Sequence, residues 1–224
     1  MIEALQELDE EQSAIDRLLT GLDRGDWDRA TPSDGWTVKD QVSHLADTNE
    51  VAVDTLLGGP RSLNEDVKRF TSPDAFTQWG VERGRTLEPS EVLAWWRRSS
   101  AEMRDAFMAV DPKTRVPWGL GMQARTLVTA RLMEHWAHAV DIRRAVGESV
   151  ELTPRLRSVA WLILNAVPYA LAVAECPAPE GRTLRLELDA GEETWRLGPD
   201  DATDVVRGDA VSYTHLTLPT NREV

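Results

Sequence analysis

The chain contains a single cysteine, Cys176, in 224 residues. One thiol cannot form an intramolecular disulfide, so a disulfide-stapled secreted fold is excluded and a reducing compartment is predicted, namely the cytoplasm. A lone cysteine followed by a proline is not by itself a reactive thiol, and Cys176 is not expected to act as a nucleophile.

Long apolar runs and clustered positive charge are also missing. No stretch reaches the roughly 20 apolar residues that a membrane-spanning helix needs, and residues 1–11 are acidic and amphipathic, unlike a signal peptide. The formal net charge is −13, spread along the chain. Such a charge repels a phosphate backbone, so neither a membrane nor a nucleic acid is expected as a partner.

Several motifs of common enzyme classes are absent as well. The sequence has no Gly-rich phosphate loop, no Ser-His-Asp ordering and no Cys-x-x-Cys pair. Aromatic residues are mostly tryptophan, with nine tryptophans against two tyrosines. These large apolar rings need burial in a core or a place in a pocket.

Four segments carry apolar residues at helical spacing, and they predict a mainly α fold. They are residues 2–22, 37–57, 89–110 and 126–146. Thr37 and Asp40 form a capping-box pattern at the start of the second segment, and Gly147 is a natural end for the fourth. The long connection between the second and third segments predicts a short helix near residues 73–80. A four-helix bundle over residues 1–147 is therefore expected.

The pattern changes after residue 147. A fifth helix is predicted from residues 153–154, interrupted at Pro168. Alternating residues at 184–188 and 194–197 then predict a β-hairpin, and residues 205–206 a third strand. Residues 148–210 are expected to form a small, truncated α+β module.

Residues 211–224 show no helix or hairpin signal of their own. They resemble the translation of a sequencing-library adapter and are predicted to be an artefactual tail. On this interpretation the α+β module is truncated near Ala210, and His215 carries no functional meaning.

Only four histidines occur, and three lie in the predicted helices. Glu134 and His138 are four residues apart and project from one face of a helix. With His44 from a facing helix they give two histidines and one carboxylate, a set that suits catalytic zinc with one open position. Ferrous iron and nickel remain alternatives. Asp141, one turn beyond His138, is predicted to accept the other N–H of that imidazole.

Two other interpretations of the histidines stay open. His135 and His138 are three residues apart and could chelate instead, although Glu134 would then be buried without an evident partner. Alternatively, His44, Glu134 and His138 form a hydrogen-bonded polar cluster in the bundle core with a purely structural role.

Two motifs resemble a known family. Residues 31–45, TPSDGWTVKDQVSHL, resemble the entry to the second helix of the DinB-like superfamily, in particular the metal-binding N-terminal domain of mycothiol-dependent maleylpyruvate isomerases. Residues 134–143, EHWAHAVDIR, are similar to the second metal motif of that family. The resemblance covers residues 1–147 and implies His44, Glu134 and His138 as metal ligands, with water as the fourth.

The remainder of the chain, from residues 156–161 (LRSVAW) through 194–195 (TW) and 198–199 (GP), resembles an actinobacterial metal-binding subfamily whose C-terminal part is similar to sterol-carrier proteins. Together these resemblances imply a zinc-dependent isomerase or transferase that uses mycothiol to attack an electrophilic small molecule. In that scheme Asp141 orients His138 for catalysis. Trp36 and Trp136 flank the ligands in sequence and either line the thiol cleft or belong to the core. The alternative function is a non-catalytic metal- or thiol-binding module of a stress response.

Overall fold

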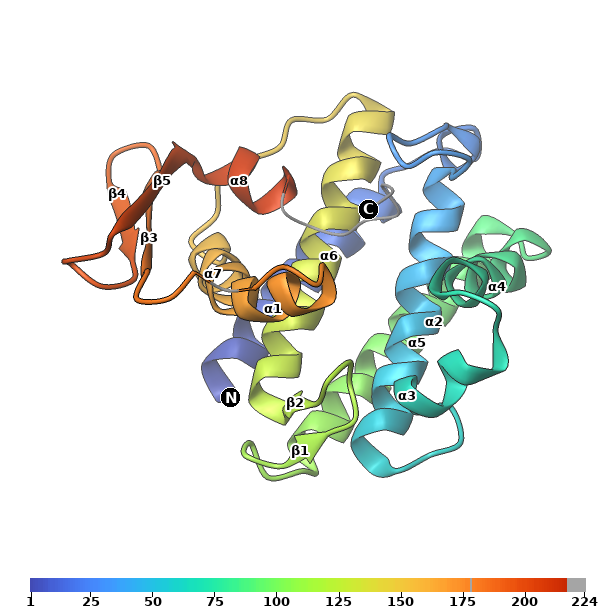
Figure 1. The fold of residues 1–224 in the computed structure, drawn as a ribbon. Coiled ribbons are helices and arrows are strands. Elements are labelled where there is room, and N and C mark those ends of the chain that lie inside the picture. The colour runs from blue at the N-terminus through green and yellow to red at the C-terminus, as the bar shows by residue number, and fades with distance from the viewer. Residues whose placement is uncertain (178, 217–224) are drawn as a thin grey trace. The chain divides into compact units, whose positions relative to one another are not determined.

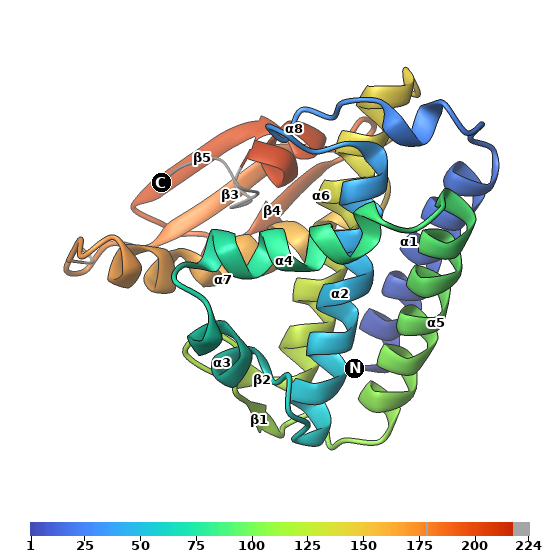
Figure 2. The ribbon, with the colours of Figure 1, turned by 90° about the vertical axis from the view of Figure 1, so that its right-hand side faces the viewer.

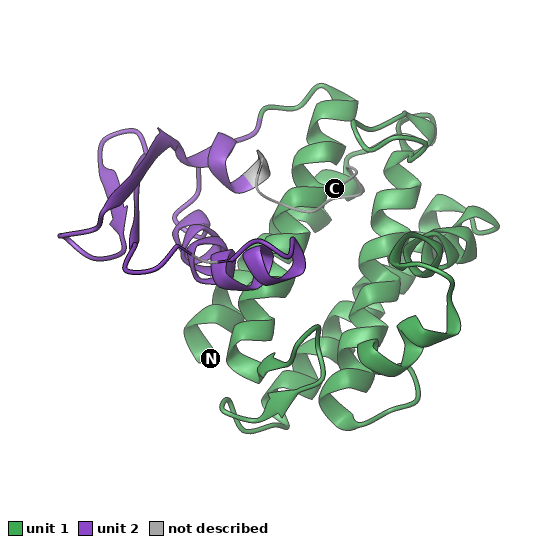
Figure 3. Cartoon of the chain, viewed as in Figure 1, with its two compact units in different colours: residues 1–149, 220–224 green, residues 150–219 purple. Residues whose placement is uncertain are grey.

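The computed structural model describes residues 1–177 and 179–216. The chain divides into two compact units (Figure 3). The first is Met1–Ser149, a bundle of helices. The second begins at Val150 and combines helices with a small sheet, so the fold is mainly α, as predicted.

Four long helices build the first unit, and each of the four predicted segments is confirmed. They are α1 (Ile2–Thr20), α2 (Val38–Leu57), α5 (Pro89–Met108) and α6 (Ala124–Val146). Helix α2 packs against both α5 and α6, and α1 packs against α6 (Figures 1 and 2). The core between them includes Ile15, Val42, Leu45, Trp96 and Ile142. Burial of these side chains holds the facing surfaces of α2 and α6 in register.

The start of α2 is set by the predicted capping box. The Thr37 side chain accepts a hydrogen bond from the Asp40 amide, and the Asp40 carboxylate accepts one from the Thr37 amide. These bonds satisfy backbone donors that the first turn leaves open. At the other end Gly58 adopts a left-handed conformation, with φ at 75°, as Gly147 does after α6.

The connection between α2 and α5 is more helical than predicted. It contains α3 (Leu63–Asp66), the 3₁₀ turn η2 (Val67–Arg69) and α4 (Pro73–Arg85), which extends five residues past the predicted end at residue 80. Gly80 and Gly84 do not end α4, because they are where it packs closely on α2. A Cβ at Gly84 would lie 2.5 Å from Ser43 Cβ, so α4 can lie this close only without a side chain there.

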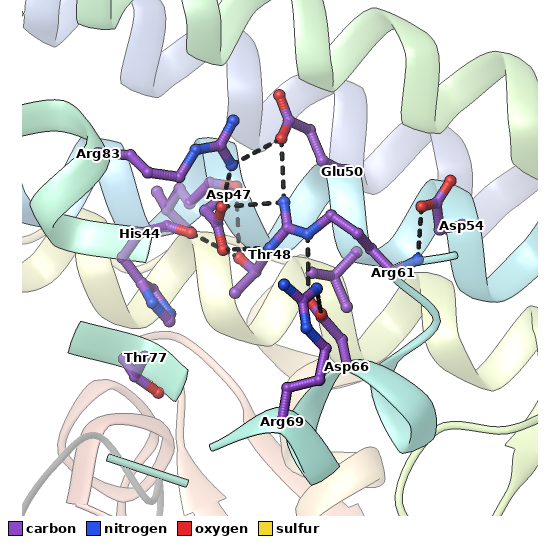
Figure 4. A network of polar contacts seen from close by, with 12 residues as sticks. His44, Asp47, Thr48, Glu50, Asp54, Arg61, Asp66, Arg69, Thr77 and Arg83 are labelled. Atoms are coloured by element: carbon purple, nitrogen blue, oxygen red, sulfur yellow. Dashed lines mark hydrogen bonds and ion pairs between the residues drawn. The ribbon is translucent and has the colours of Figure 1, made fainter. Parts of the chain in front are cut away.

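A network of ion pairs joins this connection to α2 (Figure 4). Arg61 and Arg83 both bond to Asp47 and Glu50 of α2. Arg61 also bonds to the buried Asp66, at 3.0 Å. The network fixes α3 and α4 against the half of α2 that follows His44.

A short hairpin precedes α6. It pairs β1 (Arg115–Val116) with β2 (Met122–Gln123) in antiparallel fashion. The loop between the strands carries Trp118.

The second unit confirms the predicted strands. Strand β3 (Leu184–Asp189) pairs with β4 (Thr194–Leu197) as an antiparallel hairpin and with β5 (Asp204–Asp209) in parallel, giving the order β4-β3-β5. Leu186 and Leu188 are fully buried on one face of β3, as the alternation predicted.

Two predictions for this unit are wrong. Helix α7 (Leu156–Val173) runs through Pro168, where only the hydrogen bond to the carbonyl of Leu164 has to be lost. The stretch after Val211 was expected to lack a helix, yet α8 (Ala210–Leu216) forms there and buries Thr214. The hydroxyl of Thr214 donates to the carbonyl of Ala210, 2.9 Å away, within the first turns of α8. Residues 217–224 of the proposed tail lie outside the described residues.

Helix α7 is also the one helix among the described residues that is long and apolar enough to cross a membrane, judged by length and composition. A single helix of this kind is weak evidence for a membrane span.

Candidate metal centre

Three side chains from two helices converge in the first unit. The Nε2 atom of His44 on α2 lies 3.8 Å from Glu134 Oε2 on α6, and the Nε2 atom of His138 lies 3.5 Å from the same oxygen. One ligand atom from each residue falls within 4.8 Å of the other two. A tetrahedral ion with bonds of about 2.1 Å requires ligand atoms roughly 3.4 Å apart, so small side-chain adjustments would accommodate one.

Helix geometry explains the convergence. Glu134 and His138 are one turn apart on α6 and share a face. His44 lies in the second turn of α2, which packs against that face of α6. The two rings lie with their centroids 4.6 Å apart. The predicted trio is therefore brought together by the fold.

The protonation states suit a cation. Burial lowers the pKa of His44 to about 4, so its imidazole is neutral at pH 7. Burial raises the pKa of Glu134, but hydrogen bonds to His138 and His44 outweigh this and hold that pKa well below its usual range. A neutral imidazole and an ionised carboxylate are the forms that coordinate metal.

Gln41, and not Asp141 as predicted, hydrogen-bonds directly to His138. The Nδ1 atom of His138 hydrogen-bonds to Gln41 Oε1, which leaves Nε2 facing Glu134. Gln41 Nε2 in turn donates to Asp141 Oδ2 at 3.4 Å, and Ser33 Oγ donates to the same oxygen at 2.8 Å. Asp141 is thus one step further from the ring, because the longer Gln41 side chain reaches the imidazole first.

Gln41 and Ser33 were missed from the sequence. Both lie in the 31–45 motif, and Gln41 precedes His44 by three residues, which places it on the same face of α2. That spacing was the available signal for a residue behind the ligands.

The two tryptophans expected near the ligands differ in their position relative to them. Trp36 is buried beside them, with its ring stacked on His138 at 6.0 Å between centroids and tilted against His44 at 5.2 Å. Trp136 is also buried, but it lies about 200° around α6 from Glu134, by helix geometry. Its Nε1 has no hydrogen-bond partner in the described part of the chain. Trp36 therefore flanks the ligands, whereas Trp136 projects away from them.

His135 does not pair with His138 as a chelate. Its Nδ1 hydrogen-bonds to the carbonyl of Arg131, 2.8 Å away, and its Nε2 contacts the amide of Gln12 on α1 at 3.2 Å. Both ring nitrogens are occupied within the protein, and burial lowers the pKa of His135 to about 3. The alternative ligand pair is excluded by this orientation.

Comparisons with known proteins agree with this architecture. A family model for the mycothiol maleylpyruvate isomerase N-terminal domain matches residues 8–143. Two uncharacterized proteins from two strains of Mycobacterium tuberculosis are each 31% identical over 208 residues, covering 92% of this chain and 80% of the relative.

Solved structures give the same fold. A crystal structure of mycothiol-dependent maleylpyruvate isomerase matches 96% of this chain and 87% of its own, with a TM-score of 0.64 and 21% identity. The structure of a single-residue variant of that enzyme gives a TM-score of 0.65 at 22% identity, with the same coverage. At these identities the match establishes the fold.

Proposed function

The chain belongs to the mycothiol maleylpyruvate isomerase N-terminal domain family, and from this premise we propose that it is a metal-dependent isomerase or transferase using a small thiol. Mycothiol is the proposed thiol, and the second substrate is an electrophilic small molecule. The observation that carries the proposal is the convergence of two imidazole nitrogens on one carboxylate oxygen.

His44, Glu134 and His138 are the proposed ligands of one divalent ion. Two neutral imidazoles and one ionised carboxylate form the donor set of many catalytic zinc sites, in which a fourth position stays open. Zinc is the proposed metal on that ground. The Glu134 side chain is 30% exposed, so the cluster is accessible from solvent on that side.

A bound zinc ion would supply Lewis acidity that favours the thiolate form of a thiol at neutral pH. The protein's own groups prepare the site for it. Gln41 holds the His138 ring through Nδ1, and Asp141 with Ser33 holds the Gln41 amide. Such partners behind a ligand fix its tautomer and its direction. The buried Trp36 ring lies nearly parallel to the His138 ring, with 6.0 Å between the centroids.

The experiment is metal analysis of purified protein together with a thiol-dependent activity assay. Wild type should hold one equivalent of zinc, and His44→Ala, Glu134→Ala and His138→Ala should each lose it. His135→Gln is the matched control. It removes a neighbouring imidazole whose two ring nitrogens already contact Gln12 of α1 and the α6 backbone. That variant should keep its zinc.

Activity separates the two proposed functions. Mycothiol-dependent conversion of maleylpyruvate, or of another activated electrophile, should disappear with the metal. Stoichiometric zinc without any thiol-dependent turnover would favour the non-catalytic metal- or thiol-binding module. Wild type without metal after reconstitution would refute both and leave a structural polar cluster.

The predicted cytoplasmic location belongs to the same proposal, because mycothiol chemistry and a single cysteine both suit a reducing compartment. The partners proposed are therefore small molecules.

A further inference from the structure

Arg131 is a buried cation that bonds only to neutral groups. Its side chain is 1% exposed. The Nη2 atom donates to Thr48 Oγ1 at 2.9 Å and to Asn49 Oδ1 at 3.1 Å. Within the described residues no carboxylate forms an ion pair with Arg131, and its buried Nε has no hydrogen-bond partner.

An unpaired buried charge is strongly destabilising, so its presence calls for an explanation. Burial lowers the pKa of Arg131 to about 10, which still leaves the guanidinium charged at neutral pH. Elsewhere in the bundle the half-buried Arg61 bonds to three carboxylates. Arg131, by contrast, feels the negative charge of Glu134 but forms no ion pair with it, so it keeps a charge that a bound anion could neutralise.

The position of Arg131 places this charge beside the candidate metal centre. It precedes Glu134 by one turn of α6, on nearly the same face. On α2 its partner Thr48 follows His44 by one turn and donates to the His44 carbonyl at 2.8 Å. Asp141 lies beyond the ligands at the other end, about 15 Å from Arg131 along α6. The ligand cluster thus has a cation on one side and a carboxylate on the other.

We propose that Arg131 binds the carboxylate of a small molecule that occupies the metal centre. This inference rests on the proposed function. It assigns the ligand a carboxylate that points to the Arg131 side of the ligand cluster. A divalent ion, two neutral imidazoles, Glu134 and Arg131 sum to two positive charges. A thiolate and a carboxylate together would neutralise them.

Trp118 restricts how such a carboxylate approaches. The ring of this half-buried residue, from the β1–β2 loop, lies 5.9 Å from Arg131 Cζ. The guanidinium carbon thus lies over the ring, and the N–H groups of a guanidinium all point outward within its own plane. The carboxylate must therefore come in at the edge of the guanidinium, where Nη1 makes no hydrogen bond within the described chain.

The test compares matched probes with and without a carboxylate. On zinc-loaded protein, calorimetry gives the dissociation constants of mercaptoacetate and of neutral 2-mercaptoethanol. Wild type should bind the carboxylate thiol at least tenfold more tightly. Arg131→Gln should lose most of this preference while its affinity for 2-mercaptoethanol stays unchanged, and Arg131→Lys should keep part of it. Arg125→Gln, on an exposed part of α6, is the matched control and should behave as wild type.

Direct chelation of zinc by mercaptoacetate would also give a preference, but that preference would survive in Arg131→Gln and would overturn the proposal. Equal affinities for both thiols in wild type would overturn it too. Circular dichroism and zinc content show whether Arg131→Gln is folded. If it is not, the carboxylate preference is measured in Arg131→Lys instead.

A metal-free titration separates this proposal from the proposed function. Propionate, but not neutral propionamide, should bind metal-free wild type and fail to bind Arg131→Gln. If wild type holds no zinc, the proposed function fails, but this titration still shows whether Arg131 binds a carboxylate. Absence of propionate binding in folded metal-free protein, together with a thiol preference that does not depend on Arg131, would refute the carboxylate site.

Discussion

Removing Gln41 should weaken zinc binding although Gln41 is not a proposed ligand. The Gln41→Leu substitution keeps the side-chain volume but removes the oxygen that holds His138 Nδ1. It also removes the amide that bonds to Asp141 and, at 2.9 Å, to Thr31 Oγ1. The imidazole is then free to rotate or to change tautomer, and its Nε2 is no longer directed at Glu134.

The magnitude follows from comparable sites. Loss of a partner behind a metal-bound histidine typically costs 10- to 100-fold in metal affinity, or about 1.4 to 2.7 kcal/mol. The assay is competition for zinc against a chromophoric chelator at constant pH. Zinc affinity should fall by at least tenfold in Gln41→Leu, with helix content by circular dichroism unchanged.

Gln12→Leu is the matched control for this experiment. Gln12 also contacts a ring nitrogen of a histidine on α6, at 3.2 Å, but that histidine is His135. The zinc affinity of Gln12→Leu should equal that of wild type. If Gln41→Leu binds zinc within threefold of wild type while remaining folded, the argument that Gln41 positions His138 is refuted.

Two further predictions concern stability. In metal-free protein burial lowers the pKa of His44 to about 4 and of His135 to about 3, from 6.5 in the unfolded chain. Between pH 6.5 and pH 4 the unfolded state binds protons on these two histidines and the folded state does not. The free energy of unfolding should therefore be highest at pH 7 and fall towards pH 4. Urea titrations that give the same free energy of unfolding at both pH values would contradict this. Gly84→Ala places a Cβ 2.5 Å from Ser43 Cβ and should lower the free energy of unfolding by about 1–3 kcal/mol. Gly208→Ala meets nothing within 4 Å and should change it little, so equal effects in thermal denaturation would oppose this account of the α2–α4 contact.

Local signals predicted much of the first unit. The Thr37 capping box and Gly147 set helix ends in agreement with the structure, because caps act within one turn and need no tertiary information. Glu134 and His138 could be placed on one face of a helix from their spacing alone. That His44 faces them depended on how α2 and α6 pack, and the family resemblance supplied that expectation.

Tertiary contacts explain the predictions that were wrong. The helix was predicted to end near Gly80, but α4 continues there, and Gly80 lies against Asp47 of α2. Asp141 has the right spacing to bond to His138, yet Gln41 from the other helix reaches the ring first. Arg131 was missed because an arginine in an amphipathic helix is ordinarily expected at the surface, and only the fold buries it.

The central claim is that two histidines and one glutamate hold a zinc ion that accepts a thiol. X-ray absorption at the zinc edge tests it most directly, recorded on metal-loaded protein before and after addition of mycothiol. The account predicts four nitrogen or oxygen ligands at about 2.0–2.1 Å, and then one sulfur at about 2.3 Å in place of an oxygen. An unchanged spectrum with mycothiol, or a spectrum without histidine scattering, would contradict it.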